Sequence, residues 1–299
     1  MLKSMNPRRF RYVVGLALLG GLGIQIQQAL QDSADEAPSV VVVNPAKLTG
    51  NAAIAAPAPP AANRMETLEE RAARDPIGFI EFCIDRYDQS VRDYKCIFTK
   101  QELIAGKLSA EQVMRAFFRE KPFSVRLEWI KNEDKCARVL YVADRWIEKG
   151  KQLAVVEPGK IARLFIPYVM MEIDGRDAQK SSRRTINQFG FRNSLSLILK
   201  YCKLAQEKGL LHFEYVGQGE VDGRATLVFE RRLPYVEGDP TWPDRVLVVH
   251  IDKEHLLPSL CIAYADDEKT QLLGKYMMTD LQLNANLPDA VFTKEGMGL

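Results

Sequence analysis

The feature that most constrains the fold is a series of segments, from Tyr94 onward, in which apolar and polar residues alternate. In the clearest of them the apolar positions are Phe123, Val125, Leu127 and Trp129. A period of two is typical of a strand that buries one face. Further strands are predicted at 94–104, 111–120, 138–143, 145–150, 152–156, 162–172, 211–220, 224–233, 245–251, 259–266 and 272–283. Asp222-Gly223 joins two of these segments and is typical of a tight hairpin turn.

Two segments have a helical period instead. Asp75-Pro76 combines a capping carboxylate with a proline suited to the first helical position, which predicts a helix start. The apolar residues that follow at three- and four-residue spacing are Ile77, Ile80, Ile84, Tyr87 and Val91. A second amphipathic helix is predicted from Asn193 to Glu207, with Gly209 as its terminator.

These elements predict an α+β fold. Short connections favour pairing between consecutive strands, so a large antiparallel meander is expected. A sheet of this length has to curl, and the two helices need an apolar surface to cover. We therefore predict an open half-barrel whose concave face is covered by the helices, with an apolar cavity beneath them.

The first 65 residues differ from the rest of the chain. Basic residues precede an apolar run of 13 residues, Tyr12–Ile24, which as a helix would span about 20 Å. We interpret residues 1–30 as a signal peptide or a short N-terminal membrane anchor. Residues 31–65, rich in Ala and Pro, are interpreted as a disordered linker. Residues 66–299 are then the folded domain, and the basic N-terminal side predicts that it is translocated.

Composition and motifs exclude several kinds of site. The net charge is +2 and no basic stripe interleaves with aromatics, so nucleic acid is not an expected partner. The five cysteines form no C-x-x-C pair, which gives a zinc site little support. No G-x-S-x-G or H-E-x-x-H motif occurs, and His250 continues the alternation of Val246 and Val248 as a sheet residue would. We predict no enzyme activity, no catalytic residues, no metal and no cofactor.

Three segments together point to a known family. They are the sequence from Phe117 to Trp129, the sequence from Val139 to Trp146, and the ending from Tyr276 to Phe292. The first resembles the strand–"K/R-P"–strand hairpin of the LolA-like superfamily of outer-membrane lipoprotein-sorting proteins. The second is similar to the "V-x-D-G-x-x-x-W" hairpin of that superfamily, with Arg145 in place of Gly. Within the superfamily, the chain most resembles a bacterial domain of unknown function, number 1571.

The resemblance implies an unclosed barrel that binds an acyl chain, a lipid or a lipoprotein without catalysis. It also implies that Lys121, at the "K/R-P" turn, helps to hold the lid or the cargo, with Arg119 as a neighbour that could substitute. Phe123, Val125, Leu127 and Trp129 share one strand face and are the expected apolar lining. The expected location is the periplasm or another envelope space, with the N-terminus at the membrane. The alternative is a membrane-tethered regulatory module that binds an envelope protein.

Overall fold

The computed structural model describes residues 65–133 and 135–299. The predicted signal peptide or anchor, residues 1–30, and all of the predicted linker except Met65 therefore lie outside the described residues. The helices are α2 (Leu68–Arg74), α3 (Pro76–Ser90), α4 (Arg176–Gln179) and α5 (Phe191–Glu207), with 3₁₀ turns η1 (Ala162–Leu164), η2 (Ile186–Gln188), η3 (Asp289–Phe292) and η4 (Glu295–Met297). The strands are β1 (Asp93–Ile104), β2 (Lys107–Leu108), β3 (Gln112–Arg119), β4 (Ser124–Lys131), β5 (Cys136–Val142), β6 (Ile147–Glu148), β7 (Lys151–Pro158), β8 (Val169–Glu172), β9 (His212–Val221), β10 (Arg224–Arg232), β11 (Val246–Asp252), β12 (Pro258–Tyr264) and β13 (Leu272–Leu283).

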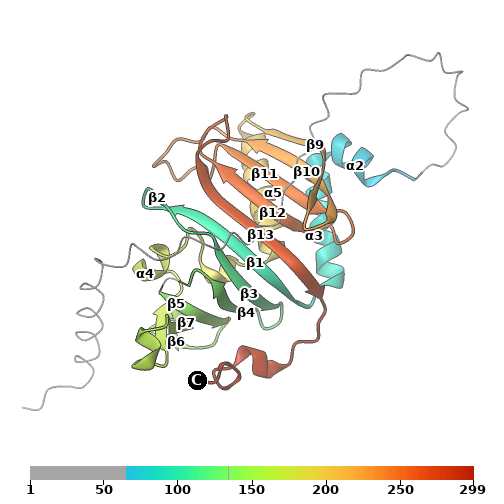
Figure 1. Ribbon diagram of the computed structural model, residues 1–299. Coiled ribbons are helices and arrows are strands. Elements are labelled where there is room, and N and C mark those ends of the chain that lie inside the picture. The colour runs from blue at the N-terminus through green and yellow to red at the C-terminus, as the bar shows by residue number, and fades with distance from the viewer. Residues whose placement is uncertain (1–64, 134) are drawn as a thin grey trace, which may run out of the picture. The chain divides into compact units, whose positions relative to one another are not determined.

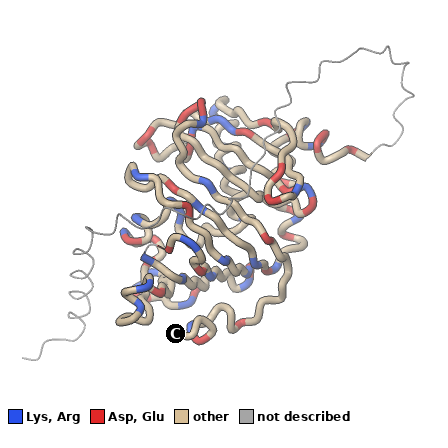
Figure 2. The backbone as a smooth tube through the Cα atoms, viewed as in Figure 1, with Lys and Arg blue, Asp and Glu red and all other residues tan. Residues whose placement is uncertain are grey.

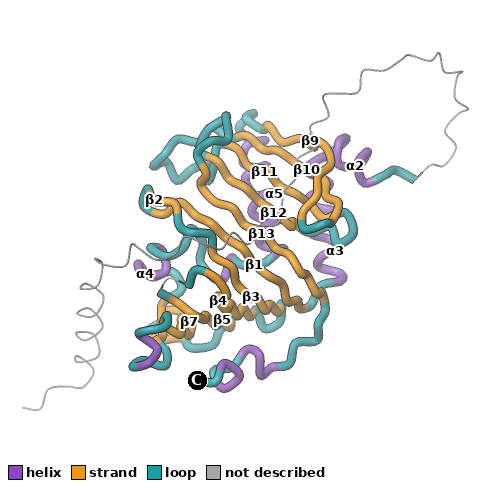
Figure 3. Tube along the Cα trace, in the orientation of Figure 1, coloured by secondary structure: helices purple, strands orange, loops and turns teal. Residues whose placement is uncertain are grey.

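The strands form one curled, unclosed antiparallel sheet (Figure 1). Its order is β6-β7-β5-β4-β3-β1-β13-β12-β11-β10-β9, with β2 beside β1 and β8 beside β7. The helices α3 and α5 lie across one face of the sheet, which we call the inner face (Figures 1 and 3). The predicted α+β class and the predicted open half-barrel with helices on its concave face are confirmed.

The predicted single meander is wrong in its middle. Two meanders, β1–β7 and β9–β13, join through the pairing of β1 with β13, from Tyr94 opposite Leu283 to Glu102 opposite Gly274. As a result β8 and β9, which are consecutive in sequence, lie toward opposite edges of the sheet. The physical reason is α5, whose 17 residues span about 25 Å and carry the chain across the inner face.

Two other predicted strands are largely turns. Only Ile147–Glu148 of the segment 145–150 is a strand, and the segment 162–172 begins with η1 before β8. The predicted hairpin at Asp222-Gly223 is confirmed, with φ of 53° and 72° as a type I′ turn requires. The helix start at Asp75-Pro76 is also confirmed, since the Asp75 side chain accepts a hydrogen bond from Gly78 N at 2.9 Å. The short helix α2 was not predicted.

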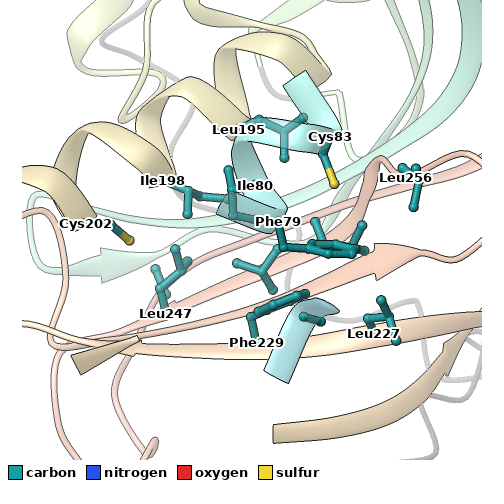
Figure 4. Packing of buried hydrophobic residues seen from close by; sticks show 14 of the residues in the cluster. Phe79, Ile80, Cys83, Leu195, Ile198, Cys202, Leu227, Phe229, Leu247 and Leu256 are labelled. Atoms are coloured by element: carbon teal, nitrogen blue, oxygen red, sulfur yellow. The ribbon is translucent and has the colours of Figure 1, made fainter. Parts of the chain in front are cut away.

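The two long helices are held by a core on the inner face. Phe79, Ile80 and Cys83 of α3 point toward Leu195, Ile198 and Cys202 of α5 and toward Leu227 and Phe229 of β10 (Figure 4). All of these side chains are at least 96 % buried. Burying a large apolar side chain contributes about 1.5–3 kcal/mol. The helix pair is therefore an integral part of the domain core over the β9–β13 half of the sheet.

The opposite, outer face is covered by the C-terminal segment over strands β3–β7. Phe292 and Met297 are buried there against Leu140, Val142 and Val155. Arginines from this face hold the segment: Arg126 donates to the carbonyls of Val291 and Gly296 at 3.1 Å each, and Arg138 donates to Met297 O at 2.6 Å. The sequence patterns that we used did not predict a covering for this face.

Candidate ligand-binding pocket

The larger of the two pockets described here lies between the β3–β4 hairpin and the start of α5. Its volume is about 250 Å³. The lining residues are Phe118, Glu120 and Phe123 from the hairpin, and Phe189, Gly190, Arg192 and Asn193 from the start of the helix. Rings supply the apolar wall and Glu120 and Arg192 supply charge. The pocket therefore combines the two properties that a ligand with an apolar part and a polar head requires.

The apolar wall is part of a larger row of aromatic rings. Phe118 contacts Phe123 edge to face, with centroids 5.1 Å apart, and stacks on Tyr94 at 4.7 Å. Tyr94 in turn contacts Phe191 of α5 at 4.8 Å. Phe189, which precedes the helix, contacts Phe98 of β1 edge to face at 5.2 Å. Such pairs each contribute about 0.5–1.5 kcal/mol beyond burial, so the wall is fixed by the core behind it.

The charged groups at the pocket are anchored by neighbours. Glu120 accepts a hydrogen bond from the hydroxyl of Tyr87 at 2.6 Å, and burial together with this bond raises the pKa of Tyr87. Arg192 forms two hydrogen bonds with Asp88, at 2.6 and 2.9 Å, and they raise the pKa of Arg192. Both partners, Tyr87 and Asp88, belong to α3. The rim thus has one anchored anion and one anchored cation.

Gly190 and Asn193 determine how the first turn of α5 is placed against the aromatic rings. Gly190 precedes α5 with a φ of +111°, a conformation that residues with a Cβ rarely adopt. A Cβ at this position would also lie 3.0 Å from the Phe118 ring and 3.2 Å from the Tyr94 hydroxyl. Asn193 then donates to the carbonyls of Asn187 and Phe189, at 3.2 and 3.0 Å. The glycine lets the helix approach the rings closely, and the asparagine fixes the preceding segment.

A buried carboxylate anchors the connection that leads to this helix. Glu102 of β1 is 1 % exposed and accepts hydrogen bonds from Lys100 Nζ at 3.0 Å, Ser182 Oγ at 3.0 Å and Tyr276 OH at 2.8 Å. Burial alone would raise the pKa of Glu102, but the Lys100 ion pair and these hydrogen bonds hold it below its ordinary value. No sequence motif predicts this arrangement, because Ser182 and Tyr276 are 80 and 174 residues from Glu102 in the chain.

The structure brings four of the six predicted site residues to the inner face: Phe123, Val125, Leu127 and Trp129. Phe123 lines the pocket, and Lys121, next to Glu120, is exposed in the hairpin turn. Val125, Leu127 and Trp129 follow Phe123 on the inner face and pack in the same cluster, so they form core beside the pocket and do not line it. Within the described part of the chain, the Lys121 ammonium forms no ion pair.

Arg119 is not brought together with the others. Its side chain lies on the outer face, where it is paired with Asp289 and stands 4.6 Å from the centre of the Phe292 ring. The reason is the register: Arg119 is one residue from Phe118, and successive side chains of a strand point to opposite faces. We therefore leave Arg119 out of the site.

The pocket is smaller than the cavity expected beneath the helices. Much of the space between the sheet and the helices is filled by the aromatic and aliphatic side chains of two large clusters. The second described pocket, beside Phe191 and Asp252, has a volume of about 20 Å³, enough for about one water molecule. The alternation of apolar residues predicted the face correctly, but it could not show how completely side chains fill that face.

No histidine or cysteine of the described chain lines the larger pocket. His250 is 1 % exposed and its Nδ1 lies 3.0 Å from the Thr226 hydroxyl, as expected for a sheet residue. The five cysteines are free thiols, and burial raises the pKa of Cys83, Cys136 and Cys261 to about 12. Among the described residues, no group of three or more His, Cys, Asp or Glu could hold a metal ion. Nor does any helix of residues 65–133 and 135–299 have the length and apolarity needed to span a membrane.

Comparison with known proteins identifies the family. Residues 91–296 match the family model described as "Protein of unknown function (DUF1571)". The chain belongs to this family. The resemblance to this family inferred from the β3–β4 hairpin and the closing strand is thereby confirmed, and the sheet is unclosed, as that resemblance implied. A search of curated proteins finds no match.

Solved structures show distant similarity. A putative outer membrane lipoprotein-sorting protein domain from Vibrio parahaemolyticus is 15 % identical, with a TM-score of 0.35, and the match covers 75 % of this chain and 98 % of that one. The Mycobacterium tuberculosis lipoprotein LppX is 12 % identical over 72 % of this chain and 98 % of that one, with a TM-score of 0.35. The MucA/MucB complex of Pseudomonas aeruginosa gives 14 % identity and a TM-score of 0.41, over 73 % of this chain and 60 % of the matched chain. At these TM-scores the similarities say nothing about function.

Proposed function

We propose that this chain is a non-catalytic cell-envelope protein that binds the acyl chain of a lipid or lipoprotein in the pocket between the β3–β4 hairpin and α5. The observation that carries the proposal is the aromatic wall formed by Phe118, Phe123 and Phe189 directly beside the charges of Glu120 and Arg192. An acyl chain would lie against the rings, and its polar head would remain at the rim. Arg192 is the cation that lines the pocket, where Asp88 holds it, and Lys121, next to Glu120 in the hairpin turn, is exposed and is the further cation that we assign to an anionic head.

The size of the pocket limits what it can hold. Its volume of about 250 Å³ exceeds that of a cavity that admits benzene, about 150 Å³, but is below the usual 300–1,000 Å³ of drug-sized sites. We infer that one end of an acyl chain enters and the remainder stays outside. Each buried methylene contributes about 0.8 kcal/mol, so five of them supply about 4 kcal/mol. The buried methylenes alone therefore correspond to a dissociation constant of about 1 mM, and any tighter binding has to come from the rings and the polar head.

A titration with a fluorescent fatty acid tests the proposal. Phe123→Asp removes one ring from the wall and places a carboxylate there, so we expect binding to weaken about tenfold or more. Val236→Asp is the control, because Val236 is a 63 % exposed apolar residue that does not line the pocket. Both variants are first checked for cooperative melting, so that a loss of binding is not a loss of folding.

A second substitution tests the rim. Lys121→Gln should weaken binding of the fatty acid but leave binding of its uncharged methyl ester unchanged, since only the acid carries a charge for Lys121 to attract. If the folded wild-type protein shows no saturable binding and no lipid copurifies with it, the proposal is wrong. A regulatory module that binds an envelope protein would then be the better interpretation.

A further inference from the structure

Exposed apolar side chains are concentrated in the turn between β7 and β8. Ile161 is 79 % exposed, Leu164 and Phe165 are 77 % exposed, and Ile166 is 38 % exposed. These are four of the twelve large hydrophobic residues that are exposed in the described chain, and they lie within six consecutive positions. An apolar patch of this kind is typical of a surface that binds a membrane or another protein.

The turn presents these side chains from an ordered backbone. The 3₁₀ turn η1 is closed by a hydrogen bond from Phe165 N to Ala162 O at 3.1 Å. Arg163 N donates to Gly159 O at 3.2 Å, and Ile166 N donates to Ala162 O at 2.9 Å. At its base, Gly159 N donates to Lys135 O at 2.9 Å, which ties the turn to the β4–β5 connection. Figure 3 shows η1 as a short helical segment among the loops at this end of the sheet. The apolar residues are therefore held outward by the fold.

The charges around the turn favour an anionic surface. Lys160, within the turn, and Lys135, at its base, are both exposed. Arg163 is 43 % exposed and lies 3.9 Å from Glu157. Glu157 itself is buried and paired with Arg138, so its charge is compensated within the protein. Figure 2 shows basic residues close to acidic ones over the domain as a whole.

We propose that the turn 159–167 inserts into the surface of an anionic membrane. One aromatic and three aliphatic side chains, with lysines beside them, have the composition of segments that enter the boundary between headgroups and acyl chains. Each Lys or Arg near an anionic surface adds to the attraction. A stable protein interface needs about 800 Å² on each partner, whereas the exposed apolar side chains of this turn come from only six consecutive positions. The inference is independent of the pocket, which is lined by the β3–β4 hairpin and α5.

The experiment uses the full chain. Any contribution of the apolar run Tyr12–Ile24 to vesicle binding is then the same in every variant. Phe165→Trp and Val236→Trp each add one fluorophore, and Val236 is the matched control as a 63 % exposed apolar residue in another loop. Vesicles of phosphatidylcholine and phosphatidylglycerol carry bromine on their acyl chains. Only a tryptophan that enters the bilayer is quenched, so we expect quenching beyond that of the wild type for Phe165→Trp and none for Val236→Trp.

Binding is then measured by sedimentation with the same vesicles. Phe165→Asp should lower vesicle binding about tenfold or more, because it removes the ring and adds a negative charge, whereas Val236→Asp should not. Lys160→Glu should weaken binding to the mixed vesicles more than to vesicles of phosphatidylcholine alone. Equal quenching at positions 165 and 236, or unchanged binding of Phe165→Asp, would overturn the proposal, and a protein partner for the turn would then be sought. Neither result bears on fatty-acid binding in the pocket.

Discussion

Protonation of His250 should destabilise the domain as the pH falls. The ring is buried in the sheet, and the backbone of Gly219 is so close that a Cβ there would lie 3.1 Å from its Cε1. Burial lowers the pKa of His250 from 6.5 to about 4. Between these two values the unfolded chain binds more protons than the folded chain, so stability falls with falling pH. One pKa unit corresponds to 1.36 kcal/mol, which gives a loss of about 2 kcal/mol by pH 5.

Urea unfolding at pH 7 and pH 5 measures this loss. His250→Gln has no ring to protonate, so its stability should change much less between the two pH values, whatever its stability at pH 7. His212→Gln is the matched control, because the His212 side chain is 52 % exposed, and it should retain the wild-type dependence. A wild-type loss below about 0.5 kcal/mol, or an equal loss in His250→Gln, would refute the reasoning.

Three further predictions concern stability and accessibility. Glu102→Gln leaves the Lys100 ammonium without its ion-pair partner, so the free energy of unfolding should fall by about 3 kcal/mol. The same change at the exposed Glu148 should have little effect, and denaturant titration measures both variants. Phe292→Ala empties a 99 % buried position on the outer face and should cost about 3–5 kcal/mol in the same assay. A chain that begins at Met65 should melt cooperatively in calorimetry, and failure to do so would show that the preceding residues belong to the folded unit.

Local patterns predicted the elements of the fold well. The alternation Phe123, Val125, Leu127 and Trp129 correctly placed these residues on one face, because strand geometry enforces a period of two. The helix cap at Asp75 and the hairpin turn at Asp222 could also be predicted, because each depends only on residues that are adjacent or nearly adjacent in the sequence. The pairing of β1 with β13 was not predictable in this way, since it joins segments that are about 180 residues apart and no local pattern records it.

The candidate site was only partly predictable. Phe123 was found by alternation, but Phe189 and Arg192 precede or begin a helix and become neighbours of the hairpin only when α5 crosses the sheet. The misplaced residue, Arg119, shows the opposite limitation. Its proximity in sequence to Lys121 suggested a shared site, yet the pleat directs its side chain to the outer face, where Asp289 pairs with it.

The most direct test of acyl-chain binding is photocrosslinking with a fatty acid that carries a diazirine on its chain. After irradiation of the folded protein and proteolysis, mass spectrometry locates the labelled peptides. The proposed function predicts labels on peptides that contain Phe118, Phe123 or Phe189, with competition by unlabelled fatty acid and loss of labelling in Phe123→Asp. Labelling confined to other regions, or labelling that unlabelled fatty acid does not reduce, would contradict it.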